Sequence, residues 1–229
     1  MANNEEKPSL AKLLQMAIDS KLCDVHTAMP GVVQSYDRDT QTAKIQPALK
    51  RKYSDGRVVD LPIINKVPVV FPRSTGKWLH FDLEAGDVVT LIFSERSLDI
   101  WKEKGGLVSP NDPRKFHLSD AYAIPGGYPI GKPLSLNGGD GSIEMANGSN
   151  HIVIEKDGKT NIENGGGKIE MSSAGKFKVT NNTEELLDLL VQLTDILSTT
   201  TTNTVFGPMQ LNDFLDIAVI RNKLESLKG

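Results

Sequence analysis

The pattern of apolar and polar positions changes several times along the chain, and each change predicts a different kind of element. Residues 9–22 place apolar side chains at helical spacing behind Ser9, a good helix-capping residue. From Pro30 the chain turns to short apolar-rich runs bounded by Pro, Gly, Asp or Asn, at residues 32–36, 43–46, 58–61, 67–70 and 87–93. Short strands at this spacing predict a closed barrel of the OB type over residues 30–109.

The helix at residues 9–22 lies in an N-terminal lead-in of residues 1–29, and the sequence leaves the partner of its apolar side open. The helix either packs on its own domain or docks onto a neighbouring subunit. The docking candidates are Leu10, Leu13, Leu14 and Ala17. After the barrel, residues 110–141 contain too many prolines and glycines for a regular element, so we expect an ordered extended linker there.

At residues 142–181, pairs of apolar residues return every eight or nine residues between Gly, Asn, Ser and Asp. The apolar members are Ile143, Met145, Ile152, Ile154, Ile162, Ile169, Met171, Phe177 and Val179. Successive short strands of this kind expose an apolar face that nothing in the same chain covers. Three chains wound about one axis would bury it as a trimer core, so we expect an intertwined, triple-stranded β-helix with Gly and Asn at its corners. An antiparallel sheet with ordinary hairpins is the alternative.

From Asn182 the apolar spacing becomes helical. Asn182 and Glu185 resemble a capping box, and a second helix is expected at about residues 211–227, after a run of threonines. The expected helix-packing residues are Leu186, Leu190, Leu193, Leu197, Phe214, Ile217 and Leu224. We expect residues 182–229 to form a helical tip in which three chains close the β-helix. A tip that contacts lipid or a partner protein is the alternative.

Composition and charge argue against a nucleic-acid-binding protein, a signal peptide and a membrane-spanning segment. A net charge of -3 and a pI of about 5.8 argue against nucleic acid as a partner, since phosphate binding needs clustered Lys and Arg. The barrel aromatics Trp78, Phe81, Phe93 and Trp101 stand among apolar neighbours and are expected in the core rather than on a base-stacking surface. The N-terminus has acidic residues where a signal peptide needs positive charge, and no window reaches the roughly 18 unbroken apolar residues of a membrane span.

Candidate chemistry is sparse. The single cysteine, Cys23, excludes an intramolecular disulfide and a cysteine-based zinc site. The histidines form no HxH or HExxH motif, and GxSxG, P-loop and Rossmann patterns are absent from the sequence. His151 would form a ring of imidazoles only if it faced a trimer axis, and the alternation of the strand places it outward. We therefore expect no catalytic residue, no metal site and no cofactor.

Three stretches resemble a known family. VVQSYDRDTQTAKIQPALK at residues 32–50, SERSLDIW at 94–101 and LSDAYAIPG at 118–126 resemble the N-terminal OB domain of contractile-tail phage baseplate spikes, the membrane-puncturing needle family. The likeness covers roughly residues 10–130, and the repeats that follow are similar to the trimeric β-helix of that family. Two features differ: the chain has no HxH motif for an iron-stabilised point, and residues 110–141 are too few for a lysozyme domain.

The resemblance implies a homotrimer in the virion, at the tail baseplate. Its OB domains would sit on a hub protein under the tail tube, with Leu10, Leu13, Leu14 and Ala17 as the expected hub contacts. A separate tip protein is a further expected partner at the C-terminal end. The expected function is that of a non-enzymatic central spike that plugs the tube and mechanically punctures the host outer membrane. A trimeric receptor-binding fibre or adhesin is the alternative, and a polysaccharide-degrading β-helix enzyme is disfavoured by the short strands.

Overall fold

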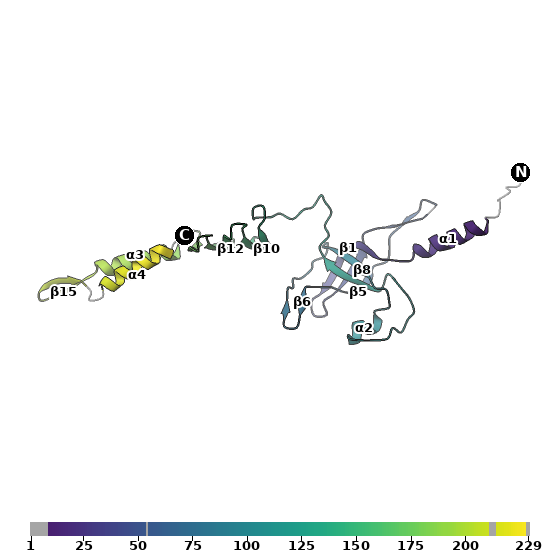
Figure 1. Ribbon diagram of the computed structural model, residues 1–229, viewed down its shortest axis with the longest axis horizontal. Coiled ribbons are helices and arrows are strands. Elements are labelled where there is room, and N and C mark those ends of the chain that lie inside the picture. The colour runs from purple at the N-terminus through teal and green to yellow at the C-terminus, as the bar shows by residue number, and fades with distance from the viewer. Residues whose placement is uncertain (1–8, 54, 211–213, 228–229) are drawn as a thin grey trace. The chain divides into compact units, whose positions relative to one another are not determined.

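The computed structural model describes residues 9–53, 55–210 and 214–227. The chain is mainly β, with a few helices, and divides into two compact units. Unit 1 is Met1–Pro133 and unit 2 is Leu134–Gly229. Figure 1 shows the curled sheet of unit 1 and, in unit 2, a ladder of short strands followed by a pair of helices.

A five-stranded antiparallel sheet forms the body of unit 1, in the order β5-β2-β1-β8-β9. Its strands are β1 (Ala28–Asp37), β2 (Thr42–Pro47), β5 (Ile64–Pro68), β8 (Val88–Phe93) and β9 (Ala121–Pro125). Because successive strand residues point to opposite faces, alternate apolar residues meet in one core. Val33, Ile45, Val67, Val89 and Leu91 are all fully buried there. The expected strands at 32–36, 43–46, 67–70 and 87–93 overlap four of these elements, which confirms them.

The sheet curls until its two edge strands meet. Val69, just after β5, bridges Ala123 of β9 in parallel, and the Val70 amide donates to the Ala123 carbonyl over 2.8 Å. Gly31 permits a close approach inside the curl, since an added Cβ would lie 2.6 Å from Ile45 Cγ2. Strand β9 falls within residues 110–141, so the sheet of unit 1 takes up part of the stretch expected to be a linker.

Smaller elements flank this sheet. Helix α1 (Leu10–Leu22) precedes it, and the Ser9 side chain accepts a hydrogen bond from the Lys12 amide over 3.4 Å, which confirms the predicted helix and its cap. Two short hairpins follow β2 and β5, namely β3 (Arg51–Lys52) with β4 (Val58–Val59), and β6 (Arg73–Ser74) with β7 (Lys77–Trp78). Helix α2 (Asp99–Lys104) follows β8.

The expectation that the barrel aromatics lie in the core is wrong for most of them. Phe93 is 5% exposed, but Trp78 is 71%, Phe81 48% and Trp101 39% exposed. Phe71, which was not among the expected residues, is buried in the core instead, and it packs edge-on against Phe81 with ring centroids 5.4 Å apart. The apolar neighbours of Trp78 in the sequence therefore do not cover it, because the short β6–β7 hairpin carries it away from the main sheet.

Unit 2 begins with a second five-stranded antiparallel sheet, in which each strand pairs with the next. The strands are β10 (Ile143–Asn147), β11 (Asn150–Ile154), β12 (Thr160–Asn164), β13 (Gly167–Met171) and β14 (Phe177–Asn181). Tight turns connect them: Gly158 and Gly175 take positive φ angles, and the Asn164 side chain accepts from the Gly166 and Gly167 amides. The predicted strands are confirmed. Within one chain they form the hairpin arrangement kept as the alternative, and a β-helix is not seen.

Two helices complete unit 2. The N-cap of helix α3 (Leu186–Thr199) is Glu185, whose side chain accepts from the Asp188 amide, and helix α4 (Phe214–Leu227) packs beside it (Figure 1). The capping box expected of Asn182 with Glu185 is therefore wrong, because Glu185 itself caps a helix that begins one residue later. The connection between them contains a hairpin that the sequence analysis did not predict, β15 (Thr201–Thr204) with β16 (Gly207–Gln210). Its turn carries Val205 and Phe206, which are 97% and 93% exposed.

Candidate functional site

The strand ladder of unit 2 has one face made of apolar side chains that the chain itself leaves uncovered. The cross-strand register places Met145 opposite Ile152, Ile152 opposite Ile162, and Ile162 opposite Ile169. The face consists of the residues predicted for a trimer core: Ile143, Met145, Ile152, Ile154, Ile162, Ile169, Met171, Phe177 and Val179. Their exposed fractions run from 36% for Val179 to 70% for Ile143. An apolar patch of this extent on a folded chain marks an interaction surface.

The opposite face of the ladder is charged and internally paired. Glu170 contacts Lys168 at 2.8 Å and Lys159 at 3.2 Å, and His151 lies 3.5 Å from Glu163. The hydrogen bond from Lys168 holds the pKa of Glu170 below its usual range, and the same bond raises the pKa of Lys168. His151 is thus on the face opposite to the isoleucines, as the strand alternation predicts. The charges of this face are thus paired with one another within the chain.

The lead-in to the ladder also packs on the charged face. Val153 is the one ladder residue among those described that is both apolar and buried, at 2% exposed. It lies under the lead-in, because an added Cβ on Gly138 would come within 2.8 Å of the Val153 side chain. The Asn137 and Gly138 amides donate to the Glu144 carboxylate, and these bonds lower the pKa of Glu144. The chain therefore covers one face of its own ladder and leaves the other uncovered.

The apolar positions of the C-terminal helices divide into an inner and an outer set. Val191 is 6% exposed, Leu190, Ile217 and Leu224 are half-buried, and an ion pair between Arg221 and Asp195 links the two helices. Other predicted packing residues lie outside this contact: Leu186, Leu193 and Leu197 are 48%, 51% and 38% exposed. The side chain of Phe214 lies outside the described part of the structure. Helix α3 therefore presents an uncovered apolar stripe of its own.

Helix α1 has an uncovered apolar side as well. Leu10, Leu13 and Leu14 are 74%, 49% and 56% exposed, Ala17 is also exposed, and none of the described α1 residues is buried. The structure thus does not support packing of this helix on its own domain. Docking on a hub protein stays a prediction.

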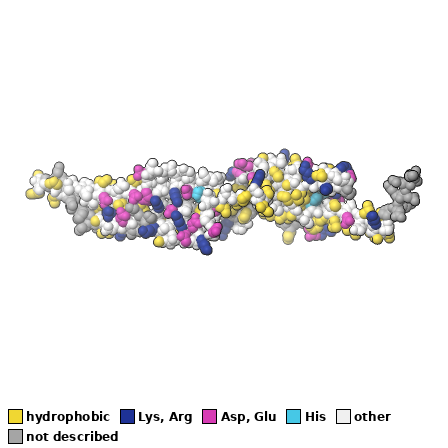
Figure 2. Space-filling view, turned by 90° about the horizontal axis from the view of Figure 1, so that it is seen from above, with side chains coloured by type: hydrophobic (Ala, Val, Ile, Leu, Met, Phe, Trp, Pro, Cys, Tyr) yellow, Lys and Arg dark blue, Asp and Glu magenta, His cyan; other side chains and the backbone are white. Residues whose placement is uncertain are grey.

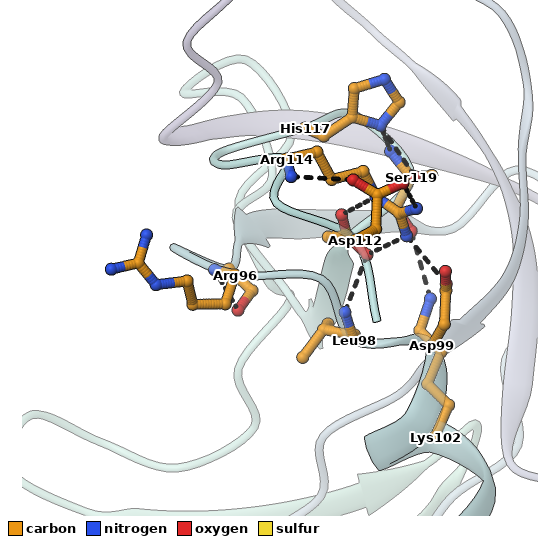
Figure 3. A network of polar contacts seen from close by, with 10 residues as sticks. Arg96, Leu98, Asp99, Lys102, Asp112, Arg114, His117 and Ser119 are labelled. Atoms are coloured by element: carbon orange, nitrogen blue, oxygen red, sulfur yellow. Dashed lines mark hydrogen bonds and ion pairs between the residues drawn. The ribbon is translucent and has the colours of Figure 1, made fainter. Parts of the chain in front are cut away.

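A buried ionic network joins α2 to β9, and Figure 3 shows it from close by. The Arg114 guanidinium donates to both carboxylate oxygens of Asp120, over 2.6 and 2.9 Å, and contacts Asp99 at 2.8 Å and Asp112 at 3.2 Å. The Leu98 amide donates to Asp120, which is 1% exposed, over 2.9 Å. Such bidentate, charge-assisted bonds fix geometry strongly.

Electrostatics in this network favour a structural role. Burial alone would raise the pKa of Asp120, but the bonds from Arg114 and Leu98 outweigh it and hold that pKa below its usual value. The same pairing raises the pKa of Arg114. Sequence reasoning missed the network because Arg114 lies in the Pro-rich stretch expected to be a linker. A signal was nevertheless present: SERSLDIW contributes Leu98 and Asp99, and LSDAYAIPG contributes Asp120, so two of the stretches that carry the family resemblance meet here.

No group of three or more His, Cys, Asp or Glu side chains is arranged to hold a metal ion among residues 9–53, 55–210 and 214–227. Within the same residues, no helix combines the length and the apolar character needed to cross a bilayer.

Comparison with known proteins identifies the first unit. Residues 29–126 match the family model described as the phage protein Gp138 N-terminal domain. The match spans β1 through β9 and includes the Arg114 network. No curated protein matches the chain. The family is one of phage proteins, consistent with a phage baseplate spike family and with a structural protein of the virion.

Proposed function

We propose that this chain, whose residues 29–126 match the family model of the phage Gp138 N-terminal domain, is the homotrimeric central spike of a phage or phage-like contractile tail baseplate. In this proposal unit 1 is an OB-type barrel and unit 2 is the puncturing part. The observation that carries the proposal is the uncovered apolar face of strands β10–β14.

A trimer would be stabilised because it buries this apolar face. Its side chains are on average a little under half exposed in the single chain, from 36% to 70%. Complete burial of an aliphatic side chain contributes about 2 kcal/mol, so each side chain would contribute roughly 1 kcal/mol when the remainder is covered. Three ladders set face to face around one axis would cover all these residues and leave the charged faces in water. The stripe of Leu186, Leu193 and Leu197 would continue the same core into the helices.

The proposed mechanism is mechanical and uses no catalytic residue. Contraction of the tail sheath would drive the tube forward, with the trimeric ladder concentrating the force on a small area of the host outer membrane. The ladder would be stiff because bending it breaks many backbone hydrogen bonds together. At the other end, the barrels would plug the tube and seat on a hub protein, with Leu10, Leu13, Leu14 and Ala17 of α1 as contacts.

A trimeric receptor-binding fibre or adhesin is the second candidate, and one observation favours it. Val205 and Phe206, at the turn of β15–β16, are almost fully exposed. An exposed aromatic at a turn suits contact with a receptor or with a separate tip protein. Binding of the intact protein to a host-surface glycan, lost in Phe206→Ser, would favour the fibre over the spike.

The mass of the purified full-length protein tests the shared premise of both candidates. Sedimentation equilibrium should give close to three times the chain mass of 25.0 kDa. The mass should hold on dilution to low micromolar concentration. A mass of one chain would contradict the proposal, because the apolar face would then be exposed to water in the working protein.

A further inference from the structure

A pocket in unit 1 has the character of a binding site, and none of its described lining residues belongs to the Arg114 network. It opens between the β1–β2 turn and the β6–β7 hairpin, with a volume of about 700 Å³. Its lining includes Arg38, Gln41, Phe71, Arg73, Trp78 and His80. The volume lies within the range usual for ligand pockets. The space-filling view shows apolar side chains gathered over unit 1, whereas charges of both signs are interspersed over unit 2 (Figure 2).

The floor of the pocket is aromatic and held in place. Phe71 is 6% exposed, and its ring centroid lies 4.7 Å from that of His80. His80 Nε2 is in turn 3.0 Å from the Tyr36 hydroxyl. A floor fixed by ring packing and a hydrogen bond does not have to be ordered when a ligand binds, which lowers the cost of binding.

The rim combines a guanidinium with an exposed indole. Arg73 and Trp78 are directly opposed in the β6–β7 pairing, so their side chains share one face of the hairpin. Trp78 is 71% exposed. Arg73 contacts the Gln41 side chain at 3.5 Å and has no ion pair within the described residues. Arg and Trp are the residue types that most often dominate binding energy at protein interfaces.

The backbone of Gln41 is a further unusual feature of the rim. Its φ is +52°, a left-handed conformation that costs free energy for a residue other than Gly, Asn or Asp. The Val69 amide holds it there by donating to the Gln41 carbonyl over 2.9 Å. This conformation places the Gln41 side chain next to Arg73, where its amide adds polar groups to the site.

We propose that this pocket binds an acidic, extended peptide segment of a partner protein, with a carboxylate on Arg73 and an adjacent apolar side chain on Trp78. The guanidinium fork matches a carboxylate, and the indole offers a large rigid apolar surface. Nucleic acid fits less well, because Arg38 is already paired with Asp82 at 2.6 Å. Arg73 is then the one guanidinium of the described lining without an ion pair, which suits a single carboxylate, whereas a chain of phosphates needs several clustered cations. The proposal uses unit 1 alone and does not depend on a trimer of unit 2.

A random peptide library panned against the full-length protein tests the proposal. Enriched peptides should carry Asp or Glu beside an aromatic or aliphatic residue. Calorimetric titration of an enriched synthetic peptide should show about tenfold weaker binding to Arg73→Gln, the loss expected for one charge-assisted hydrogen bond. The matched control is Lys77→Gln, which removes the same charge from the neighbouring residue pair of the hairpin, at a residue that does not line the pocket, and should change affinity less than twofold.

Several results would overturn the proposal. One is enrichment of peptides without acidic residues, or no enrichment at all. Equal weakening by Arg73→Gln and Lys77→Gln would indicate a long-range charge effect rather than a site. Binding of an oligothymidylate that depends on Arg73 would assign the pocket to nucleic acid. A change in the mass of the assembly on Trp78→Ala would assign the exposed indole to a subunit contact. Circular dichroism of each variant checks that the barrel is folded.

Discussion

Replacing Ile162 by aspartate, at the centre of the uncovered ladder face, separates a trimeric spike from a monomeric sheet. Ile162 lies opposite Ile152 on one side and Ile169 on the other, and it is 45% exposed in the single chain. In a monomer the substitution removes only the part of the side chain that the single chain buries, and it should lower the free energy of unfolding by about 1–2 kcal/mol. In a trimer it places three carboxylates together around the axis.

In the trimer, the loss of association free energy depends on how much of the Ile162 side chain the trimer buries. Complete burial of an isoleucine contributes about 1.5–3 kcal/mol, so the uncovered 45% of Ile162 amounts to roughly 1 kcal/mol per chain and about 3 kcal/mol per trimer. That loss alone shifts the dissociation equilibrium by about two orders of magnitude. Each carboxylate removed from water without a partner adds several kcal/mol more. The variant should therefore dissociate at concentrations where the natural protein is a trimer.

Sedimentation velocity over a range of protein concentrations measures this shift, and thermal unfolding at matched concentration accompanies it. The control is Lys178→Asp, which introduces the same side chain on the charged face, at an exposed position opposite Glu170. That variant should keep the mass of the natural protein. A trimer that survives Ile162→Asp with unchanged thermal stability would refute the reasoning, as would a natural protein that sediments as one chain.

Three further predictions concern the described contacts. Asp120→Asn should lower the free energy of unfolding in urea by about 3 kcal/mol, because it leaves Arg114 without its buried partner. Because the pKa of Asp120 is held below its usual value, this difference should be complete above about pH 4 and shrink as the pH falls further, and a difference that grows in acid would contradict the assignment. Gly31→Ala should cost about 1–3 kcal/mol in thermal unfolding, since the new Cβ lies 2.6 Å from Ile45 Cγ2, and an unchanged melting temperature would show that β1 has room to move. Leu193→Asp should weaken the trimer while leaving the helical circular dichroism of α3 intact, and loss of helicity instead would place Leu193 in the contact between α3 and α4.

The elements that the sequence predicts best are those with a strong local period. Helix α1 with its Ser9 cap, the five ladder strands and the presence of a helix over residues 186–199 follow from apolar spacing and turn residues over a few positions. Strand β9 was missed because Pro125 and the glycines after it resemble a linker, although the strand is held by its long-range pairing with β8. The β15–β16 hairpin was missed because its threonines carry no alternating apolar signal.

The residues of the candidate sites also divide into those that the sequence predicts and those that it does not. Strand alternation alone selects the residues of the ladder face, since side chains two positions apart always share a face. The sequence does not decide which aromatic residue is buried, because Phe71 and Trp78 each have an apolar residue directly beside them in the chain. Only the path of the β6–β7 hairpin decides between them. The Arg114 network and the Arg73 pocket likewise depend on segments far apart in the chain.

The sequence by itself therefore determined the periods of this protein: where the chain is helical, where it forms short strands, and which side of each strand is apolar. Only the tertiary structure decided what covers those sides, closing the sheet of unit 1 on its own core while leaving one face of the ladder uncovered. The physical reason is that a period depends on neighbours within a few residues, whereas burial depends on surfaces that distant segments bring together.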